Sequence, residues 1–318
     1  MDAATPRQVE IFAPFEEAFA LMRAILFRPF DLGKWCVIGF AAFLAHLGGG
    51  GSFRFPSNFG KADANFRSTT QGMASLDALP GWVIPVVIAF LLIICVLVVV
   101  LTWVRARGEF IFTDCIVQNR GAIVEPWKEF RQQGNSLFLL RFLVGLSLLV
   151  LVTVLSLPFW WPLLWHHTAP SGVPLIVGIV LVVCVLLMVG IAWGMISYFM
   201  VPIMYRRRCT ALLAVREGVA LILAQPGPII LFFLFNIVLA VAFVFTACLL
   251  TCVTCCVAAI PYVGTVILLP AYVFWNSYLL LFVRQFGGEY DVWAGLTPGA
   301  ANLPPIQAPP DSPMSPLA

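Results

Sequence analysis

Long apolar runs separated by short charged segments dominate the hydrophobic pattern of this chain. A membrane-spanning helix needs about 20 consecutive apolar residues, and several runs reach that length. Between Glu217 and Arg284 no charged residue occurs, which is too long for one span, so we divide this stretch at Ile260-Pro261-Tyr262. Together with a shorter run that begins at Leu32, the pattern predicts six transmembrane helices, at residues 32–47, 82–104, 137–165, 174–205, 229–257 and 262–283.

The distribution of basic residues favours a crossing by the short first run. If residues 32–47 span the membrane, fourteen Lys and Arg residues face the cytoplasm and three (Arg54, Lys61 and Arg67) face outside. Without that crossing the numbers become ten and seven. Cytoplasmic segments of membrane proteins carry the excess of Lys and Arg, so the sequence predicts six spans with both termini in the cytoplasm.

Three cytoplasmic segments mix apolar and charged residues at helical spacing, at 15–27, 116–130 and 211–223. In the first segment, one helical face collects Phe15, Phe19, Met22, Ile25 and Leu26. Amphipathic helices of this kind lie in the plane of the membrane surface. Each segment precedes a pair of spans, so we expect three transmembrane hairpins, each preceded by an interfacial helix along the inner leaflet.

The composition agrees with an all-α integral membrane bundle. Hydrophobic residues make up 61% of the 318 residues and charged residues 10%, with a mean hydropathy of +0.99. Soluble domains carry about 25% charged residues. The net charge of +3 is too small and scattered to indicate nucleic acid. We expect one membrane domain over residues 1–285, no cleavable signal peptide, and a disordered proline-rich tail over 286–318.

Two short stretches resemble those of known membrane proteins. Residues 27–35 read Phe-Arg-Pro-Phe-Asp-Leu-Gly-Lys-Trp, and residues 107–114 read Arg-Gly-Glu-Phe-Ile-Phe-Thr-Asp. With the three-hairpin pattern, they resemble uncharacterised prokaryotic membrane proteins related to the membrane domain of some glycerophosphoryl diester phosphodiesterases. The resemblance covers about residues 15–285 and implies a bacterial inner-membrane protein. The catalytic domain of those enzymes is absent, so no catalytic residue is carried over.

A group of thiols lies on one face of the fifth predicted span, formed by Cys248, Cys252, Cys255 and Cys256. Such a face could serve a soft-metal or redox site. Four thiolates on one helix cannot surround a metal tetrahedrally without ligands from elsewhere. Cysteines are also small residues that let helices approach closely, and we expect this packing role.

The three histidines, His46, His166 and His167, all fall at the outer ends of predicted spans or in the outer loop. Imidazole suits transition metals, and the three could meet if the first and third helices are neighbours. Solvated histidines are the simpler expectation. We therefore predict no metal ligand and no cofactor.

Few polar groups occur inside the predicted spans. Asn236 and Asn276 are expected to hydrogen-bond across helices, and Gly190-Ile-Ala-Trp-Gly194 is a helix-packing motif. No Asp, Glu or Lys lies within the hydrophobic interior of a predicted span, and Arg141 lies near a cytoplasmic end. Transport of polar solutes needs a path lined by such groups. The sequence therefore predicts a closed, packed bundle interior.

No nucleotide-binding, zinc-protease or serine-hydrolase motif occurs, so we expect no enzyme. The expected function is that of a membrane-embedded scaffold or accessory protein that interacts with lipids. Its expected partners are membrane lipids and either another membrane protein or a second copy of the chain. A passive pore or small-molecule transporter is the alternative, and a redox or metal protein of the outer face is a third class.

Overall fold

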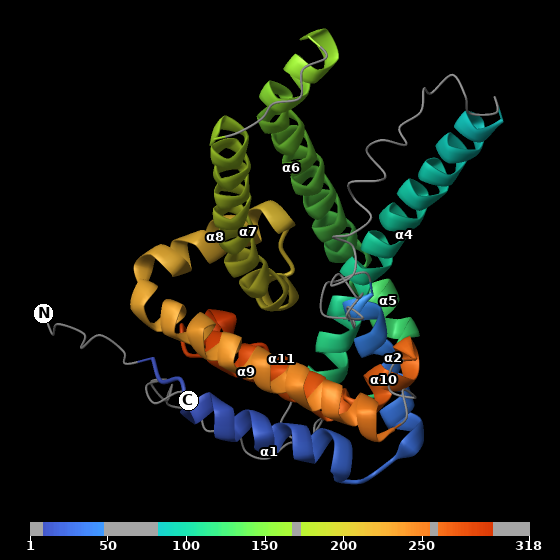
Figure 1. The fold of residues 1–318 in the computed structure, drawn as a ribbon. Helices are drawn as coiled ribbons and strands as arrows, with labels where there is room; N and C mark the ends of the chain where they lie inside the picture. The colour runs from blue at the N-terminus through green and yellow to red at the C-terminus, as the bar shows by residue number, and fades with distance from the viewer. Residues whose placement is uncertain (1–8, 48–81, 167–172, 255–259, 295–318) are drawn as a thin grey trace, which may run out of the picture.

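The computed structural model describes residues 9–47, 82–166, 173–254 and 260–294, and within these ranges the chain is all-helical (Figure 1). In chain order, the helices are α1 (Ala13–Phe27), α2 (Leu32–His46), α4 (Val83–Val117), α5 (Val124–Glu129), α6 (Arg131–His166), α7 (Val173–Arg207), α8 (Ala211–Ala224), α9 (Pro226–Val253), α10 (Pro261–Ile267), α11 (Leu269–Arg284) and the 3-10 helix η4 (Gly288–Tyr290).

Four of these helices are long and apolar enough to cross a membrane: α4, α6, α7 and α9. They correspond to the second to fifth predicted spans and make this a membrane protein by length and composition. The predicted count of six spans and the three-hairpin arrangement are not confirmed. α2, which corresponds to the first predicted span, has 15 residues. At 1.5 Å per residue it is about 22 Å long, shorter than the ~30 Å hydrocarbon core.

The helix α4 passes through two environments along its 35 residues. Its first part exposes apolar side chains such as Phe90 and Leu92, whereas residues 106–108 and 110–117 are buried in the protein. Figure 1 shows α4, α6 and α7 projecting from a base that the other helices form. We call the exposed apolar part of such a helix its shaft. A shaft is stable where lipid replaces water, because every backbone polar group of a helix is satisfied internally.

The helix α2 packs antiparallel against the buried part of α4. At its start, Asp31 caps the helix by accepting hydrogen bonds from the backbone of Gly33 and Lys34. The Lys34 ammonium then donates to Asn119 Oδ1 at 2.6 Å, beyond the end of α4. At the other end of α2, the backbone of Leu44 lies against Gly108. α2 therefore lies beside the buried part of α4 and not beside its exposed part.

The last predicted span, 262–283, is wrong as a single helix, because the chain breaks at Leu268 into α10 and α11. Pro270 causes the break, since a proline has no N–H and its ring clashes with the carbonyl four residues earlier. That carbonyl belongs to Val266, and it accepts a hydrogen bond from the Trp35 indole Nε1 at 3.0 Å. A side chain of α2 thus satisfies the backbone group that the proline leaves without a donor.

The apolar face of α1 packs on protein. Leu21 and Ile25 are fully buried, and α11 is the neighbour with most contacts to α1. The Phe15 ring lies edge-on to Phe274 of α11, with the ring centroids 5.0 Å apart. Of the five residues predicted for this face, only Phe19, with 49% of its surface exposed, is accessible enough to contact a membrane surface. The expectation that this face lies along the inner leaflet is therefore wrong for most of its residues.

The other predicted interfacial segments and the predicted tail also differ in their boundaries. The segment 116–130 is the end of α4 followed by α5, whereas 211–223 matches α8.

The folded region extends past residue 285, because η4 follows and Asp291 lies 3.2 Å from Arg284. Arg284 is also 3.9 Å from Glu17. Burial raises the pKa of Glu17, and the Arg284 charge partly opposes this effect. Residues 295–318 of the predicted tail lie outside the described residues.

We expect Gly108→Ala to destabilise the protein, because an added Cβ would lie 2.6 Å from the Leu44 carbonyl carbon. Overpacking of this kind costs roughly 1–3 kcal/mol. Gly145→Ala in α6 is the matched control, since a Cβ there would meet none of the described residues within 4 Å and alanine is the better helix former. Melting in detergent should show a lower midpoint for the first variant only. An unchanged midpoint in Gly108→Ala would contradict the close α2–α4 contact.

Candidate functional site

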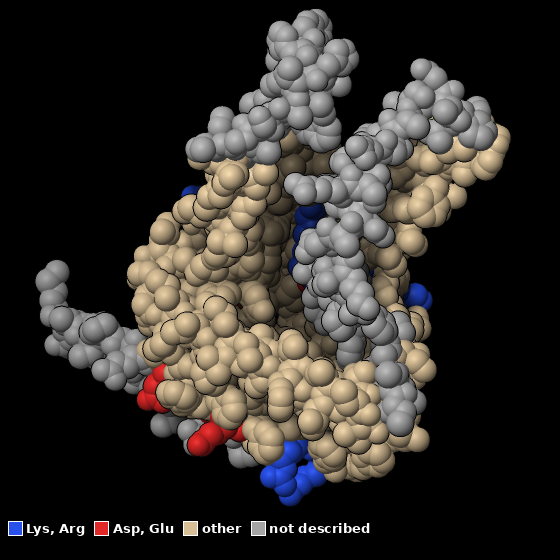
Figure 2. Space-filling view, in the orientation of Figure 1, with Lys and Arg blue, Asp and Glu red and all other residues tan. Residues whose placement is uncertain are grey.

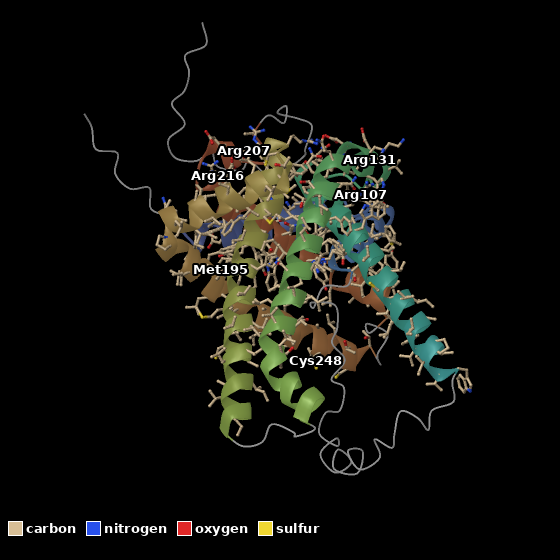
Figure 3. The ribbon with its side chains drawn as sticks, turned by 90° about the horizontal axis from the view of Figure 1, so that it is seen from above. Arg107, Arg131, Met195, Arg207, Arg216 and Cys248 are labelled. Carbon is tan, nitrogen blue, oxygen red and sulfur yellow. The ribbon has the colours of Figure 1, made fainter. Side chains whose placement is uncertain are left out.

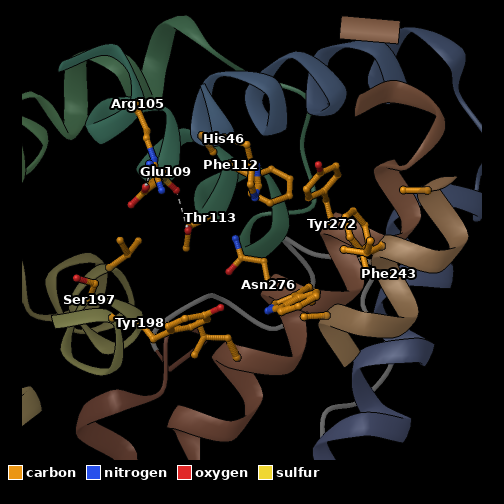
Figure 4. Close-up of a pocket in the computed structure, with 18 of the residues that line it drawn as sticks. His46, Arg105, Glu109, Phe112, Thr113, Ser197, Tyr198, Phe243, Tyr272 and Asn276 are labelled. Atoms are coloured by element: carbon orange, nitrogen blue, oxygen red, sulfur yellow. Dashed lines mark hydrogen bonds and ion pairs between the residues drawn. The ribbon is translucent and has the colours of Figure 1, made fainter. Parts of the chain in front are cut away.

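A cavity of about 1280 Å³ lies among α2, α4, α6, α7, α9 and α11 (Figure 4). Ordinary ligand pockets measure about 300–1,000 Å³, so this one is large. Figure 2 shows a hollow in the surface beside the projecting helices, with basic side chains in its depth. The prediction of a closed, packed interior is therefore wrong.

The charged part of the cavity wall consists of one carboxylate and two guanidinium groups. Arg141 of α6 donates from both terminal nitrogens to the two oxygens of Glu109 on α4, each at 2.8 Å. Arg105, one turn before Glu109, donates from Nε at 3.2 Å. Bidentate pairs of this geometry are the strong form of an ion pair. The trio joins α4 to α6 and carries a net charge of +1.

The sequence pattern gave one signal for this ion pair. An arginine within a predicted span, Arg141, needs a counter-charge. Glu109 lies five residues beyond the predicted end of the second span at residue 104, and α4 continues through it to Val117. The carboxylate was therefore missed because the helix was expected to end too early.

The end of α2 supplies the neighbouring wall. His46 lies beside the ring of Tyr272 from α11, with centroids 4.3 Å apart, and its Nδ1 is 2.7 Å from the Ala42 carbonyl oxygen. The side chain of His166 and the whole of His167, its predicted partners, lie outside the described residues. Among the described residues, no group of three or more His, Cys, Asp or Glu side chains is placed to hold a metal.

Uncharged polar groups face the same space from two other helices. Asn276 of α11 points into the cavity, with Ser197 and Tyr198 of α7 on the facing side (Figure 4). In the described part of the chain, nothing hydrogen-bonds to the Asn276 amide, and the Ser197 Oγ is buried without a partner. Pro202 of α7 also removes the usual helix donor to the Tyr198 carbonyl. The site thus offers unused hydrogen-bonding capacity.

The two asparagines that the sequence singled out have different roles. Asn236 donates to the Phe232 carbonyl of its own helix at 2.8 Å, and its Oδ1 is buried without a partner. It does not line the cavity, whereas Asn276 does. The predicted hydrogen bonds across helices are therefore found for neither residue within the described ranges.

The thiol and glycine motifs also meet the cavity. Cys248 and Cys252 of α9 are exposed and line it, while Cys255 and Cys256 lie outside the described residues. Gly194 lines it too, and nothing in the described structure lies within 4 Å of a Cβ placed on Gly190 or Gly194. Among the described residues of the chain, these two glycines do not bring a second helix close, as the packing interpretation had predicted.

Two other buried charges of α4, Asp114 and Arg107, contact protein groups and do not line the cavity. Asp114 accepts a hydrogen bond from the Tyr205 hydroxyl at 2.9 Å and pairs with Arg120 at 3.2 Å. The Arg107 guanidinium lies beside the rings of Trp103 and Trp127 and donates to Asn135 at 2.8 Å. These contacts hold the base together. Among the described residues, the charged side chains that line this cavity are those of Arg105, Glu109 and Arg141.

We expect Arg141→Met to cost roughly 3–5 kcal/mol of folding free energy, because it leaves Glu109 with the longer Arg105 contact alone. The double variant Arg141→Met/Glu109→Leu should be more stable than the single one, because no buried carboxylate remains. The melting midpoints of the wild type, the single variant and the double variant in detergent give the order of their stabilities. A double variant less stable than the single would show that Glu109 contributes chiefly through other contacts.

The chain belongs to a family of unknown function, DUF7544, which matches residues 10–292. No curated protein and no solved structure matches the chain. The family match gives no link to the glycerophosphoryl diester phosphodiesterases, and it adds no catalytic or binding residue to those that the geometry brings together.

Proposed function

We propose that this member of the DUF7544 family binds an amphipathic molecule of the bilayer, as a lipid-interacting scaffold or accessory protein. The cavity carries this proposal. Its wall combines aromatic and aliphatic side chains from six helices with one charged trio and a few unused polar groups. Such a wall suits a ligand with a hydrocarbon chain and a polar head, because each part finds a matching surface.

The position of the cavity supports a ligand that comes from the membrane. Apolar side chains cover the shafts of α4 and α7, as at Leu92 and Met188, which expose 61% and 72% of their surface. The shafts therefore border lipid, and the cavity lies where they join the base. A molecule can reach it sideways from the hydrocarbon without crossing water.

The charge pattern supports a cytoplasmic base. Figure 3 shows Arg107, Arg131, Arg207 and Arg216 at one end of the long helices, with Cys248 farther along them. Clusters of arginine mark the cytoplasmic side. We therefore propose that the base and both termini lie in the cytoplasm and that the protein belongs to the bacterial inner membrane.

Passage of a small molecule is the second candidate function. The open cavity with Asn276 favours it, because polar lining is what such a path requires. The two functions share the site but differ in outcome, since a binding protein retains its ligand and a transporter releases it on the other side.

We expect Gly194→Phe to weaken binding of a long-chain amphiphile at least about tenfold, because the ring would enter the open cavity. Gly190→Phe is the matched control, one turn away on α7 and outside the cavity lining. Binding to full-length protein in nanodiscs is the measurement, together with protection of Cys248 from a maleimide, mapped by mass spectrometry.

Equal binding by both phenylalanine variants and the wild type would contradict the proposal. Solute flux in liposomes that is lost in Asn276→Leu would decide for the transporter instead.

Reporter fusions test the six-span topology. The expected signals are outer-compartment for fusions after Gly60 and His167, and cytoplasmic for those after Gly121, Arg208 and Gln285. Val117 and Val83 mark opposite ends of α4, so a cytoplasmic Gly121 places Val83 outside. Gly60 should then lie outside as well, and the side of the N-terminus decides whether residues 32–47 cross. A cytoplasmic signal from a reporter on the N-terminus supports this crossing, whereas an outer-compartment signal would rule it out.

A further inference from the structure

The guanidinium of Arg105 is only partly used by the protein. Its Nε donates to Glu109, but its two terminal nitrogens have no acceptor among the described residues. The side chain keeps 36% of its surface exposed, whereas Glu109 and Arg141 keep 16% each. Arg141 already gives two hydrogen bonds to Glu109. Arg105 is therefore the cation of the trio that can receive a ligand.

The cavity has an excess of one positive charge. Its charged lining residues are Arg105, Arg141 and Glu109, which is two cations against one anion with His46 counted as neutral. The rest of the wall is uncharged and largely aromatic or aliphatic, and charges in such surroundings need a partner. One further negative charge would neutralise the site, whereas a second would again leave a charge uncompensated.

We propose that the ligand is an amphiphile with a singly charged anionic head, carboxylate or phosphodiester, which binds the terminal nitrogens of Arg105. The proposal rests on the binding function proposed above and names its ligand class. The Asn276 amide and the Ser197 hydroxyl face the same space and can hydrogen-bond to oxygens of the head. The chain of the ligand lies against aromatic residues such as Phe243 and Trp275.

Glu109 and Arg141 have a positioning role in this arrangement. Glu109 holds the Nε side of Arg105, so the opposite edge of the guanidinium, with its terminal nitrogens, remains available. Arg141 donates to both oxygens of Glu109, and its positive charge weakens the electrostatic repulsion between that carboxylate and an anionic ligand.

Two matched probe pairs test the ligand class: hexadecanoate against hexadecanol, and phosphatidylglycerol against phosphatidylcholine. Each is measured by equilibrium binding to the full chain in nanodiscs. A hydrogen bond to a charged group contributes about ten- to a hundredfold in affinity. We expect wild type to prefer the anionic member of at least one pair by tenfold or more, and that pair identifies the head as carboxylate or phosphodiester.

The variants assign this preference to Arg105. Arg105→Gln should reduce it to about threefold or less, while Arg105→Lys retains it in part because the charge remains. Arg216→Gln in α8 is the control, since Arg216 is exposed and outside the cavity lining. The proposal of an anionic head would be overturned if the wild type bound both members of each pair with equal affinity, or if Arg105→Gln kept the full preference. If Gly194→Phe bound all four probes as tightly as the wild type does, the cavity would not be the binding site.

Discussion

The close contact between α4 and the end of α2 at Gly108 positions much of the base. Because Gly108 has no side chain, the backbone of Leu44 and Ala45 lies in the space that a Cβ on this residue would need. The next residue along α4 is Glu109, and the next along α2 is His46. Both side chains therefore enter the same cavity wall. A larger residue would separate the two helices and the wall with them.

Charge compensation then explains why the charged residues that line the cavity are gathered at one place. Glu109 joins α4 to α6 through Arg141, whereas Asp114, farther along α4, joins it to α7 through Tyr205. The second carboxylate is enclosed by its partners, and the first opens onto unfilled space. Ion pairs in weakly polar surroundings are sensitive to any imbalance, so the place where cations outnumber anions is the place where an outside anion is most favoured.

The sequence predicted the parts of the fold that depend on composition alone. Uninterrupted apolar runs identified α4, α6, α7 and α9, because a bilayer selects for helix length and hydrophobicity. Features that depend on contacts between distant residues of the chain were missed. Charged residues such as Glu109 were taken to end a span, but Arg141 compensates that charge within the fold. The break before Pro270 was readable from the proline, yet its satisfaction by Trp35 depends on a residue 231 positions away from the carbonyl it binds. The cavity itself has no sequence signature, because it is the space that six helices leave between them.

Several of these contacts join the two ends of the chain, and this has a consequence for biogenesis. Trp35 binds the carbonyl of Val266, the Glu10 backbone exchanges two hydrogen bonds with the side chain of Gln285, and the Tyr278 hydroxyl donates to Ile11. At about 5–20 residues per second of synthesis, the N-terminal helices wait roughly 10–50 s for partners that the ribosome has not yet made. During this interval α11 is not yet available to cover the apolar face of α1. The burial of this face against α11 can therefore form only at a late stage of assembly.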